Sequence, residues 1–180
     1  MPNKPQPKDI TVDPKTTALL VLDLNARCED PKQRCHQIVQ PVAKFLERAR
    51  KAGMLIIYTA ADRYKGTPLE RMPHTFNQQP DELVCFPSAF DKFYGGEIQP
   101  ALQQRGIKTV IAMGASSNQA VMYTATSAVR PFGYDVVIPM DGLIARSEYE
   151  HEFTLHQFTI LPGGAAEKFK ITTFDQITIG

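Results

Sequence analysis

The chain has 180 residues, with 20 Lys and Arg against 19 Asp and Glu, so its formal net charge is close to zero. This balance gives no electrostatic footprint for nucleic acid or an anionic membrane surface. No apolar run approaches the roughly 20 residues that span a bilayer. We therefore expect no nucleic-acid or membrane partner, and a small molecule or another protein as ligand. The length suits one domain with a substantial core.

The first ten residues, MPNKPQPKDI, are polar and rich in proline, and they lack the apolar core of a signal peptide. We expect residues 1–14 to form a flexible leader and residues 15–180 to form a single domain. The cysteines Cys28, Cys35 and Cys85 cannot all pair, and a chain of this size needs no disulfide framework. This usage favours a reducing, cytoplasmic location.

Apolar and amphipathic segments alternate along the chain. Residues 17–25 (TALLVLDLN) predict a strand, and a helical pattern from Pro41, its first position, ends at Gly53. The pattern does not decide whether residues 36–40 add a preceding turn. Further on we expect strands at 54–59, 83–86, 109–113, 134–138 and 169–174 (an edge strand), helices at 97–104, 118–129 and 148–160, and long loops at 62–80 and 87–96.

This succession of strands and helices predicts an α/β fold. We expect a three-layer α/β/α, doubly wound and mostly parallel sheet of about six strands, joined by right-handed crossovers. Ligands of such sheets bind outside the carboxyl ends of the strands, where the strand order reverses. Asp23 and the loop 115–120 each lie at the end of an apolar strand. We therefore expect them to face one pocket.

Asp23 is the strongest chemical signal, because an ionised carboxylate on a buried strand is costly unless it is paired, protonated or used. It predicts a general acid or base; the simpler alternative is an Asp that caps a turn. The backbone N–H groups at the start of the 118–129 helix suit a carboxylate or a developing oxyanion. Ser117 and Asn118 are therefore candidates to bind substrate, or they serve only as the helix N-cap.

Several segments, taken in order, resemble the isochorismatase-like hydrolase superfamily, which includes nicotinamidases, carbamoylsarcosine-type amidases and isochorismatases. The resemblance runs from about Thr17 onward. It is carried by the strand ending in Asp23, the helix end ARKAG before LIIYT, the segment GIKTVIAMG, and VMYTA leading to GYDVVIPMDG. It implies a hydrolase fold, a small-molecule substrate and a homodimer or homotetramer.

The resemblance also implies an active site with a triad of Asp, Lys and Cys, and an oxyanion hole of backbone amides near the Cys. Asp23 matches the family Asp, but the nucleophile position falls on Ala120, whose methyl group cannot attack a carbonyl. The family lysine precedes a Ser-Ala-Phe segment, and LVCFPSAF contains none. The nearest candidate is Lys92, which reaches the pocket only if its loop folds differently and is otherwise a surface lysine.

Other residues near these positions are candidates to bind substrate: Asn25, Phe86, Phe90, Gln119 and Tyr123. Cys85, on a short apolar strand, is more simply a buried hydrophobe than a displaced nucleophile, and Cys28 has no evident base beside it. Nicotinamidases of the superfamily hold a metal through an Asp-x-His pair and a further His. Here Asp62 is followed by Arg and then Tyr64, so we expect no metal or other cofactor.

Three functions follow. The first is a hydrolase that works without a thiol, as isochorismatases of the superfamily do when an Asp protonates the alkene of a vinyl ether; the missing lysine weakens it. The second is a small-molecule-binding or scaffolding homologue without turnover, which fits the loss of both Cys and Lys. The third is an amidase inactivated by a Cys-to-Ala replacement at Ala120, against which the absent lysine also argues.

Overall fold

The computed structural model describes residues 4–180, and its centre is a seven-stranded sheet. The strand order is β4-β3-β2-β5-β6-β8, with β7 paired to β5 off this path, and every pairing in this sheet is parallel. The strands are β2 (Thr17–Leu22), β3 (Leu55–Thr59), β4 (Leu83–Cys85), β5 (Thr109–Ala115), β6 (Asp135–Pro139), β7 (Leu143–Ile144) and β8 (Phe169–Thr172). The predicted fold class is confirmed, with β7 as a strand that the sequence pattern missed.

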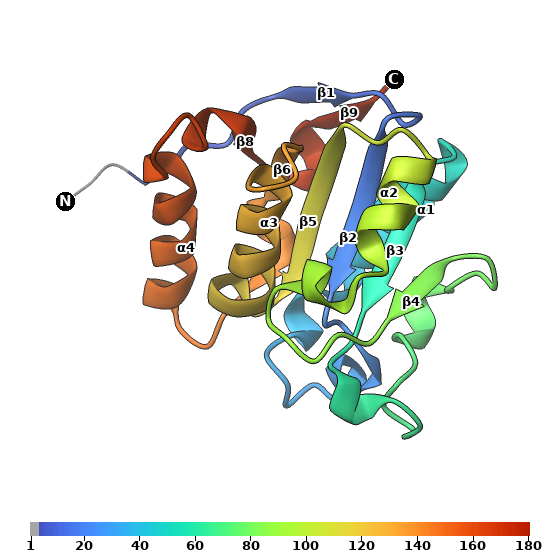
Figure 1. Cartoon of the computed structure of the whole chain (residues 1–180). Helices are drawn as coiled ribbons and strands as arrows, with labels where there is room; N and C mark the ends of the chain where they lie inside the picture. The colour runs from blue at the N-terminus through green and yellow to red at the C-terminus, as the bar shows by residue number, and fades with distance from the viewer. Residues whose placement is uncertain (1–3) are drawn as a thin grey trace.

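Helices cover both faces of this sheet. Figure 1 shows α2 (Ile98–Gln104), α3 (Met122–Val129) and α4 (Glu148–Ile160) in front of the sheet and α1 (His36–Lys51) behind it. The chain winds outward from β2 toward β3 and β4 in one direction, and from β5 toward β6 and β8 in the other. The strand order therefore reverses between β2 and β5, and a ligand crevice is expected at their carboxyl ends.

The central strand β2 is covered on both faces, and each of its six residues is buried. This explains its continuous apolar sequence, which is typical of a central parallel strand. At the end of the neighbouring β5, Gly114 has φ +134°, and a Cβ atom there would collide with the carbonyl oxygen of Leu22. Only glycine therefore allows β5 to approach β2 this closely where the two strands run into the crevice.

The start of α1 differs from the expectation. The helix begins at His36, so Pro41 lies inside it and not at its first position. A proline there cannot donate the helical hydrogen bond to the residue four positions earlier. Ile38, Val39 and Val42 are all buried, and the packing of this apolar stripe outweighs the unfavourable proline.

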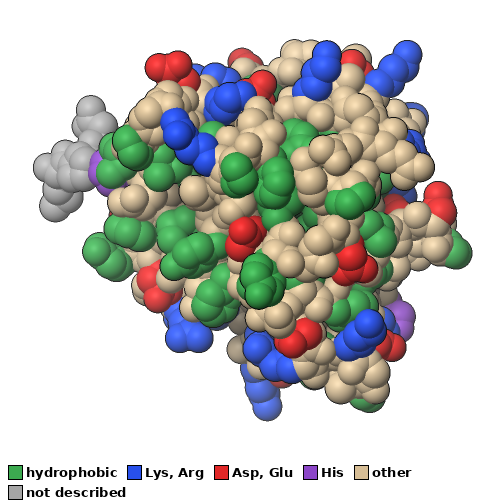
Figure 2. All heavy atoms as spheres, in the orientation of Figure 1, with side chains coloured by type: hydrophobic (Ala, Val, Ile, Leu, Met, Phe, Trp, Pro, Cys, Tyr) green, Lys and Arg blue, Asp and Glu red, His purple; other side chains and the backbone are tan. Residues whose placement is uncertain are grey.

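Helix α4 has the predicted bounds and buries only part of its apolar surface. It begins at a capping box in which Ser147 and Glu150 satisfy each other's backbone N–H groups. Its buried side chains are Thr154, Leu155 and Phe158, whereas the apolar side chains Phe153 and Ile160 are exposed. Figure 2 shows hydrophobic side chains gathered over α3 and α4, so this face presents apolar surface to solvent.

Part of the expected N-terminal leader is an ordered strand. β1 (Ile10–Val12) pairs in parallel with β9 (Ile177–Ile179), and together they form a second, two-stranded sheet. This pairing across the whole chain is a tertiary contact that the short, polar N-terminal sequence did not indicate. Residues 1–3 of the leader lie outside the described residues.

The cysteines also differ from the expectation, because Cys28 and Cys35 form a disulfide and Cys85 is free and buried. The segment between the two turns back on itself and brings their Cα atoms to 5.2 Å, within the range that a disulfide needs. No helix within residues 4–180 is long and apolar enough to cross a membrane.

Candidate active site

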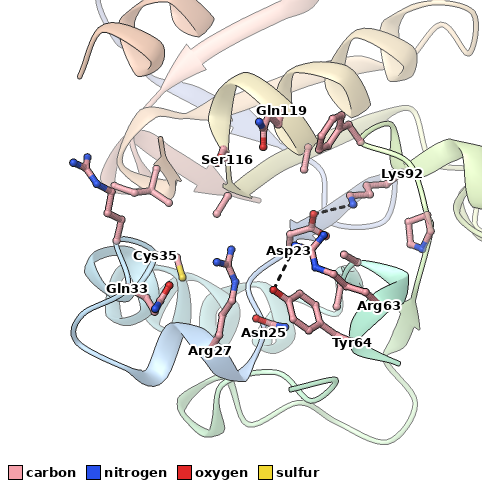
Figure 3. A pocket seen from close by; sticks show the side chains of 18 of the residues that line it. Asp23, Asn25, Arg27, Gln33, Cys35, Arg63, Tyr64, Lys92, Ser116 and Gln119 are labelled. Atoms are coloured by element: carbon pink, nitrogen blue, oxygen red, sulfur yellow. Dashed lines mark hydrogen bonds and ion pairs between the residues drawn. The ribbon is translucent and has the colours of Figure 1, made fainter. Parts of the chain in front are cut away.

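A cavity of about 390 Å³ opens at the carboxyl ends of β2, β3 and β5, at the point where the strand order reverses. Asp23 reaches it from the end of β2, Ala60 and Ala61 from the end of β3, and Ala115 from the end of β5. Figure 3 shows Asp23 near its centre, below Ser116 and Gln119. The structure thus brings together the two sequence segments that were expected to share a pocket.

Asp23 is held by contacts to both of its carboxylate oxygens. The hydroxyl of Thr59 donates to Oδ1 at 3.0 Å, and Nζ of Lys92 lies 2.8 Å from Oδ2. The backbone also fixes the residue, because its N–H donates to the carbonyl oxygen of Thr59 at 3.0 Å and its φ is +56°. Asp is one of the few non-glycine residues that tolerate this left-handed conformation. The side chain is 19% exposed, so it is partly dehydrated yet reachable from the cavity.

Lys92 is the second member of this site, and its surroundings explain how a displaced lysine reaches Asp23. Its side chain is 2% exposed, and Nζ also donates to the carbonyl oxygen of Ala89 at 3.1 Å. Its backbone N–H donates to Oγ1 of Thr124 at 3.0 Å, and the preceding Asp91 accepts a hydrogen bond from Ser127 at 2.7 Å. Both partners are on α3, so this helix fixes the loop that carries the lysine.

The ion pair decides between the two alternatives for Lys92. No lysine precedes the Ser-Ala-Phe segment, and Lys92 was expected either to reach the pocket through a differently folded loop or to be a surface lysine. Lys92 follows that segment instead, and the short 3₁₀ turn Lys92–Gly95 directs its side chain back to Asp23. Lys92 and Asp23 are therefore paired at the cavity.

Ala120 lines the same cavity from the turn that follows β5. It lies in a π-helical turn, Ser117–Val121, that continues directly into α3. The carbonyl oxygen of Ser116 accepts hydrogen bonds from the N–H groups of Gln119 and Val121, at 3.1 and 3.3 Å. This turn places the positive end of the helix at the cavity, which favours a negatively charged group there.

The predicted substrate-binding residues divide into two groups. Asn25, Phe90 and Gln119 line the cavity, whereas Phe86, Ser117, Asn118 and Tyr123 are not among its lining residues. Ser117 is fully buried, and Tyr123 is half exposed on α3, where its ring stacks on that of Phe90 with the centroids 6.1 Å apart.

Most of the cavity's charge comes from residues that the sequence did not single out. Arg27, Lys32, Arg34, Arg63 and Arg146 all line it. They lie in three loops far apart in the sequence, so their shared position depends on the tertiary fold. One signal was available: Arg27 lies only four residues after Asp23, on the same polar loop.

The cysteines are unsuited to act as nucleophiles. Burial raises the pKa of the Cys85 thiol to about 12, so it remains a neutral thiol. Cys28 is in the disulfide. Within residues 4–180, no three or more His, Cys, Asp or Glu side chains are grouped closely enough to hold a metal.

The comparison with family sequences agrees with this geometry. A family model described as "Isochorismatase domain" matches residues 17–166. The chain belongs to the isochorismatase family. Among curated relatives, it is 25% identical over 169 residues to YecD of Escherichia coli, an uncharacterized isochorismatase family protein, with 82% of this chain and 89% of that protein covered. It is 22% identical to RutB of Caulobacter segnis, a ureidoacrylate amidohydrolase, with 69% and 70% covered.

Solved structures of the isochorismatase family share the fold. A cysteine hydrolase from Pseudomonas syringae superposes with a TM-score of 0.80 at 20% identity, covering 95% of each chain. N-carbamoylsarcosine amidase from Thermoplasma acidophilum gives a TM-score of 0.75 at 20% identity, covering 89% of this chain and 97% of that one. At these identities the likeness concerns the fold.

Proposed function

We propose that this protein is a hydrolase that acts on a small molecule without a cysteine nucleophile. Asp23 serves as the general acid and base. Lys92 orients Asp23 and shares a proton with it. The observation that carries this proposal is the Lys92–Asp23 ion pair at 2.8 Å, in a cavity that Ala120 also lines. A carboxylate with a buried ammonium beside it is suited to move a proton, and water then supplies the attacking oxygen.

The reaction balances with water as the only co-substrate. The water oxygen bonds to the electrophilic carbon, and the bond from that carbon to the leaving group breaks. Asp23 takes a proton from the water and delivers it to the leaving group. With an enol ether, the acid form of Asp23 protonates the alkene carbon, water adds to the resulting oxocarbenium ion, and the proton that water loses returns to Asp23. The hemiacetal formed in this way then breaks its bond to the ether oxygen, and its hydroxyl proton passes to the departing alcohol as the carbonyl product forms.

A second candidate, an amidase inactivated at position 120, gains support from the same ion pair. The lack of a lysine before the Ser-Ala-Phe segment was an argument against this amidase, and the contact of Lys92 with Asp23 removes it. The helix start at residues 117–121 is also suited to stabilise an oxyanion beside a thiol at this position. The binding homologue without turnover loses the part of its support that came from a missing lysine.

The test is hydrolysis of a panel of enol ethers, esters and amides by the purified protein and by Asp23→Asn. We expect turnover of at least one non-amide substrate by the native protein and loss of that turnover in Asp23→Asn, with the fold intact by circular dichroism. Unchanged rates in the variant would remove Asp23 from the mechanism. Ligand-induced thermal stabilisation without any product would instead favour the binding homologue.

The variant Ala120→Cys separates the amidase from the first proposal. New amide hydrolysis in this variant, lost again in Ala120→Cys with Lys92→Met, favours the inactivated amidase. A matched control is Ala125→Cys, which adds a thiol to the buried face of α3 away from the lining of the cavity. If Ala120→Cys hydrolyses none of the amides in the panel, the result argues against the inactivated amidase.

We also propose that the protein assembles with copies of itself, as a homodimer or homotetramer. The support is the exposed apolar surface on α3 and α4, which includes Tyr123, Tyr149 and Phe153, at 50%, 76% and 40% exposure. Contiguous apolar surface of this kind marks interfaces more often than free surface. Sedimentation velocity decides the matter, and a monomer at all concentrations contradicts it.

A further inference from the structure

The cavity carries more positive charge than its own acids can neutralise. Within residues 4–180, the cationic side chains of Arg27, Lys32, Arg34, Arg63 and Arg146 have no carboxylate within ion-pair distance. Two carboxylates line the cavity with them. Asp23 is paired with Lys92, and Asp62 accepts the backbone N–H of Arg63 at 2.8 Å. Because like charges in one cavity repel, this arrangement costs stability unless an anion enters.

Arg27 is partly buried, whereas the other four cations without a carboxylate partner are exposed. It sits in the short turn that directly follows β2, and its Nε is buried with no hydrogen-bond partner among the described residues. Figure 3 shows its guanidinium pointing into the cavity. The nearest acid in sequence is Glu29, whose carboxylate accepts hydrogen bonds from Arg71 at 2.6 and 2.9 Å and lies 2.8 Å from Nδ1 of His74. A buried donor without a partner is costly, and an acidic ligand would satisfy it.

Asn25 adds a second unsatisfied group beside Arg27. Its side chain is 1% exposed, and its Nδ2 donates to the carbonyl oxygen of Leu69 at 2.8 Å. Its Oδ1 is buried and has no partner among the described residues, and the residue lines the cavity. Unpaired buried donors and acceptors in one cavity indicate that a polar ligand completes the hydrogen bonding there.

The other cations lie nearer the opening. Arg34, Arg63 and Arg146 are exposed and come from three different loops around the cavity. Exposed charges of one sign around a cleft raise the local concentration of ligands of the opposite sign. A guanidinium also matches the geometry of a carboxylate better than an ammonium does.

We propose that the substrate is a small organic acid and that Arg27 binds its acidic group. This assignment rests on the proposed function for what happens after binding, but binding itself requires no turnover. Arg27 acts here as a specificity-determining residue that selects acids over their neutral amides. The cavity volume of about 390 Å³ suits a ligand of the size of a small metabolite.

The test measures binding of two matched pairs by calorimetry: benzoate against benzamide, and succinate against succinamide. Each pair keeps the carbon skeleton and replaces the acid with a neutral amide. We expect at least one acid to bind about tenfold or more tightly than its amide, since a hydrogen-bonded charge contributes more than a neutral contact. The preference should shrink at high salt, because screening weakens exposed charges.

The decisive variant is Arg27→Met, with Arg105→Met as the matched control. Arg105 is exposed, lies at the end of α2 and does not line the cavity. Arg27→Met should lose most of the acid preference and unfold at the same temperature as the native protein or a higher one, because an unpaired buried donor is gone. Arg105→Met should keep the preference.

Two outcomes overturn the proposal: neither acid binds better than its amide, or Arg27→Met keeps the native preference. Both are read from binding alone, so they remain distinct from a failure of the hydrolase proposal, which is read from turnover and from Asp23→Asn. A protein that binds acids selectively through Arg27 but hydrolyses nothing would support this inference and contradict the hydrolase.

Discussion

The Lys92–Asp23 pair makes an asymmetric prediction for stability, because its two ends differ in access to water. The ammonium of Lys92 is 2% exposed, whereas the carboxylate of Asp23 is 19% exposed and faces the cavity. Asp23→Asn therefore leaves a buried charge whose remaining described acceptor is the carbonyl oxygen of Ala89, apart from the new amide. Lys92→Met leaves a carboxylate that Thr59 and solvent still reach.

Breaking a buried ion pair from one side costs about 3 to 5 kcal/mol, because the other charge remains uncompensated. We expect Asp23→Asn to lower the free energy of unfolding by about 3 kcal/mol, and Lys92→Met by about 1 to 2 kcal/mol, since Met fills the volume of the lysine stem. Asn suits the left-handed backbone at this position as well as Asp does. The difference therefore reports charge and not backbone strain.

Urea unfolding of the native protein, both single variants and the double variant Asp23→Asn/Lys92→Met gives the coupling free energy. The double variant should be more stable than Asp23→Asn alone, because it removes the stranded ammonium. Additive losses, or a smaller loss for Asp23→Asn than for Lys92→Met, would refute the description of this pair as a buried ammonium with a partly solvated carboxylate.

Three further predictions concern the scaffold around the cavity. Gly114→Ala should lower the free energy of unfolding by about 3 kcal/mol or more in urea unfolding, because the new Cβ collides with the carbonyl oxygen of Leu22. Hydrogen bonding to Arg71 lowers the pKa of Glu29 from 4.5 to about 2. Its stabilisation is thus complete above about pH 4.5 and lost as the pH falls toward 2; Glu29→Gln should flatten the acid limb of a stability–pH curve by no more than about 1 kcal/mol, as both side chains reach solvent. Ser147→Ala should cost about 1 kcal/mol through loss of the capping box, read from thermal melts, with no change in ligand binding.

The position of the site was predictable from sequence because it depends on local pattern and on a general property of parallel sheets. An apolar strand that ends in Asp23, and another that leads into a helix start near Ala120, place both segments at one edge of the sheet. The same alternation of strand and helix patterns predicted the mostly parallel sheet and the bounds of most helices. Where it failed locally, as for Pro41 inside α1, tertiary burial of Ile38, Val39 and Val42 outweighed a local preference.

The chemical surroundings of Asp23 were decided by the tertiary structure. The nitrogen of Lys92 reaches Asp23 because Thr124 and Ser127 on α3 fix the loop that carries it, and no short-range pattern encodes that contact. The pairing of β1 with β9 and the disulfide between Cys28 and Cys35 likewise depend on chain reversals.

Sequence alone thus determined the fold class and the shared position of Asp23 and Ala120 at one edge of the sheet, because strand and helix periodicity are local properties. Which cations face the acid was decided only by folding: Arg27, Arg63 and Arg146 share one cavity through three separate loops. The path of such loops depends on long-range packing and on the entropy of closing each loop. Neither of these can be read from local sequence patterns.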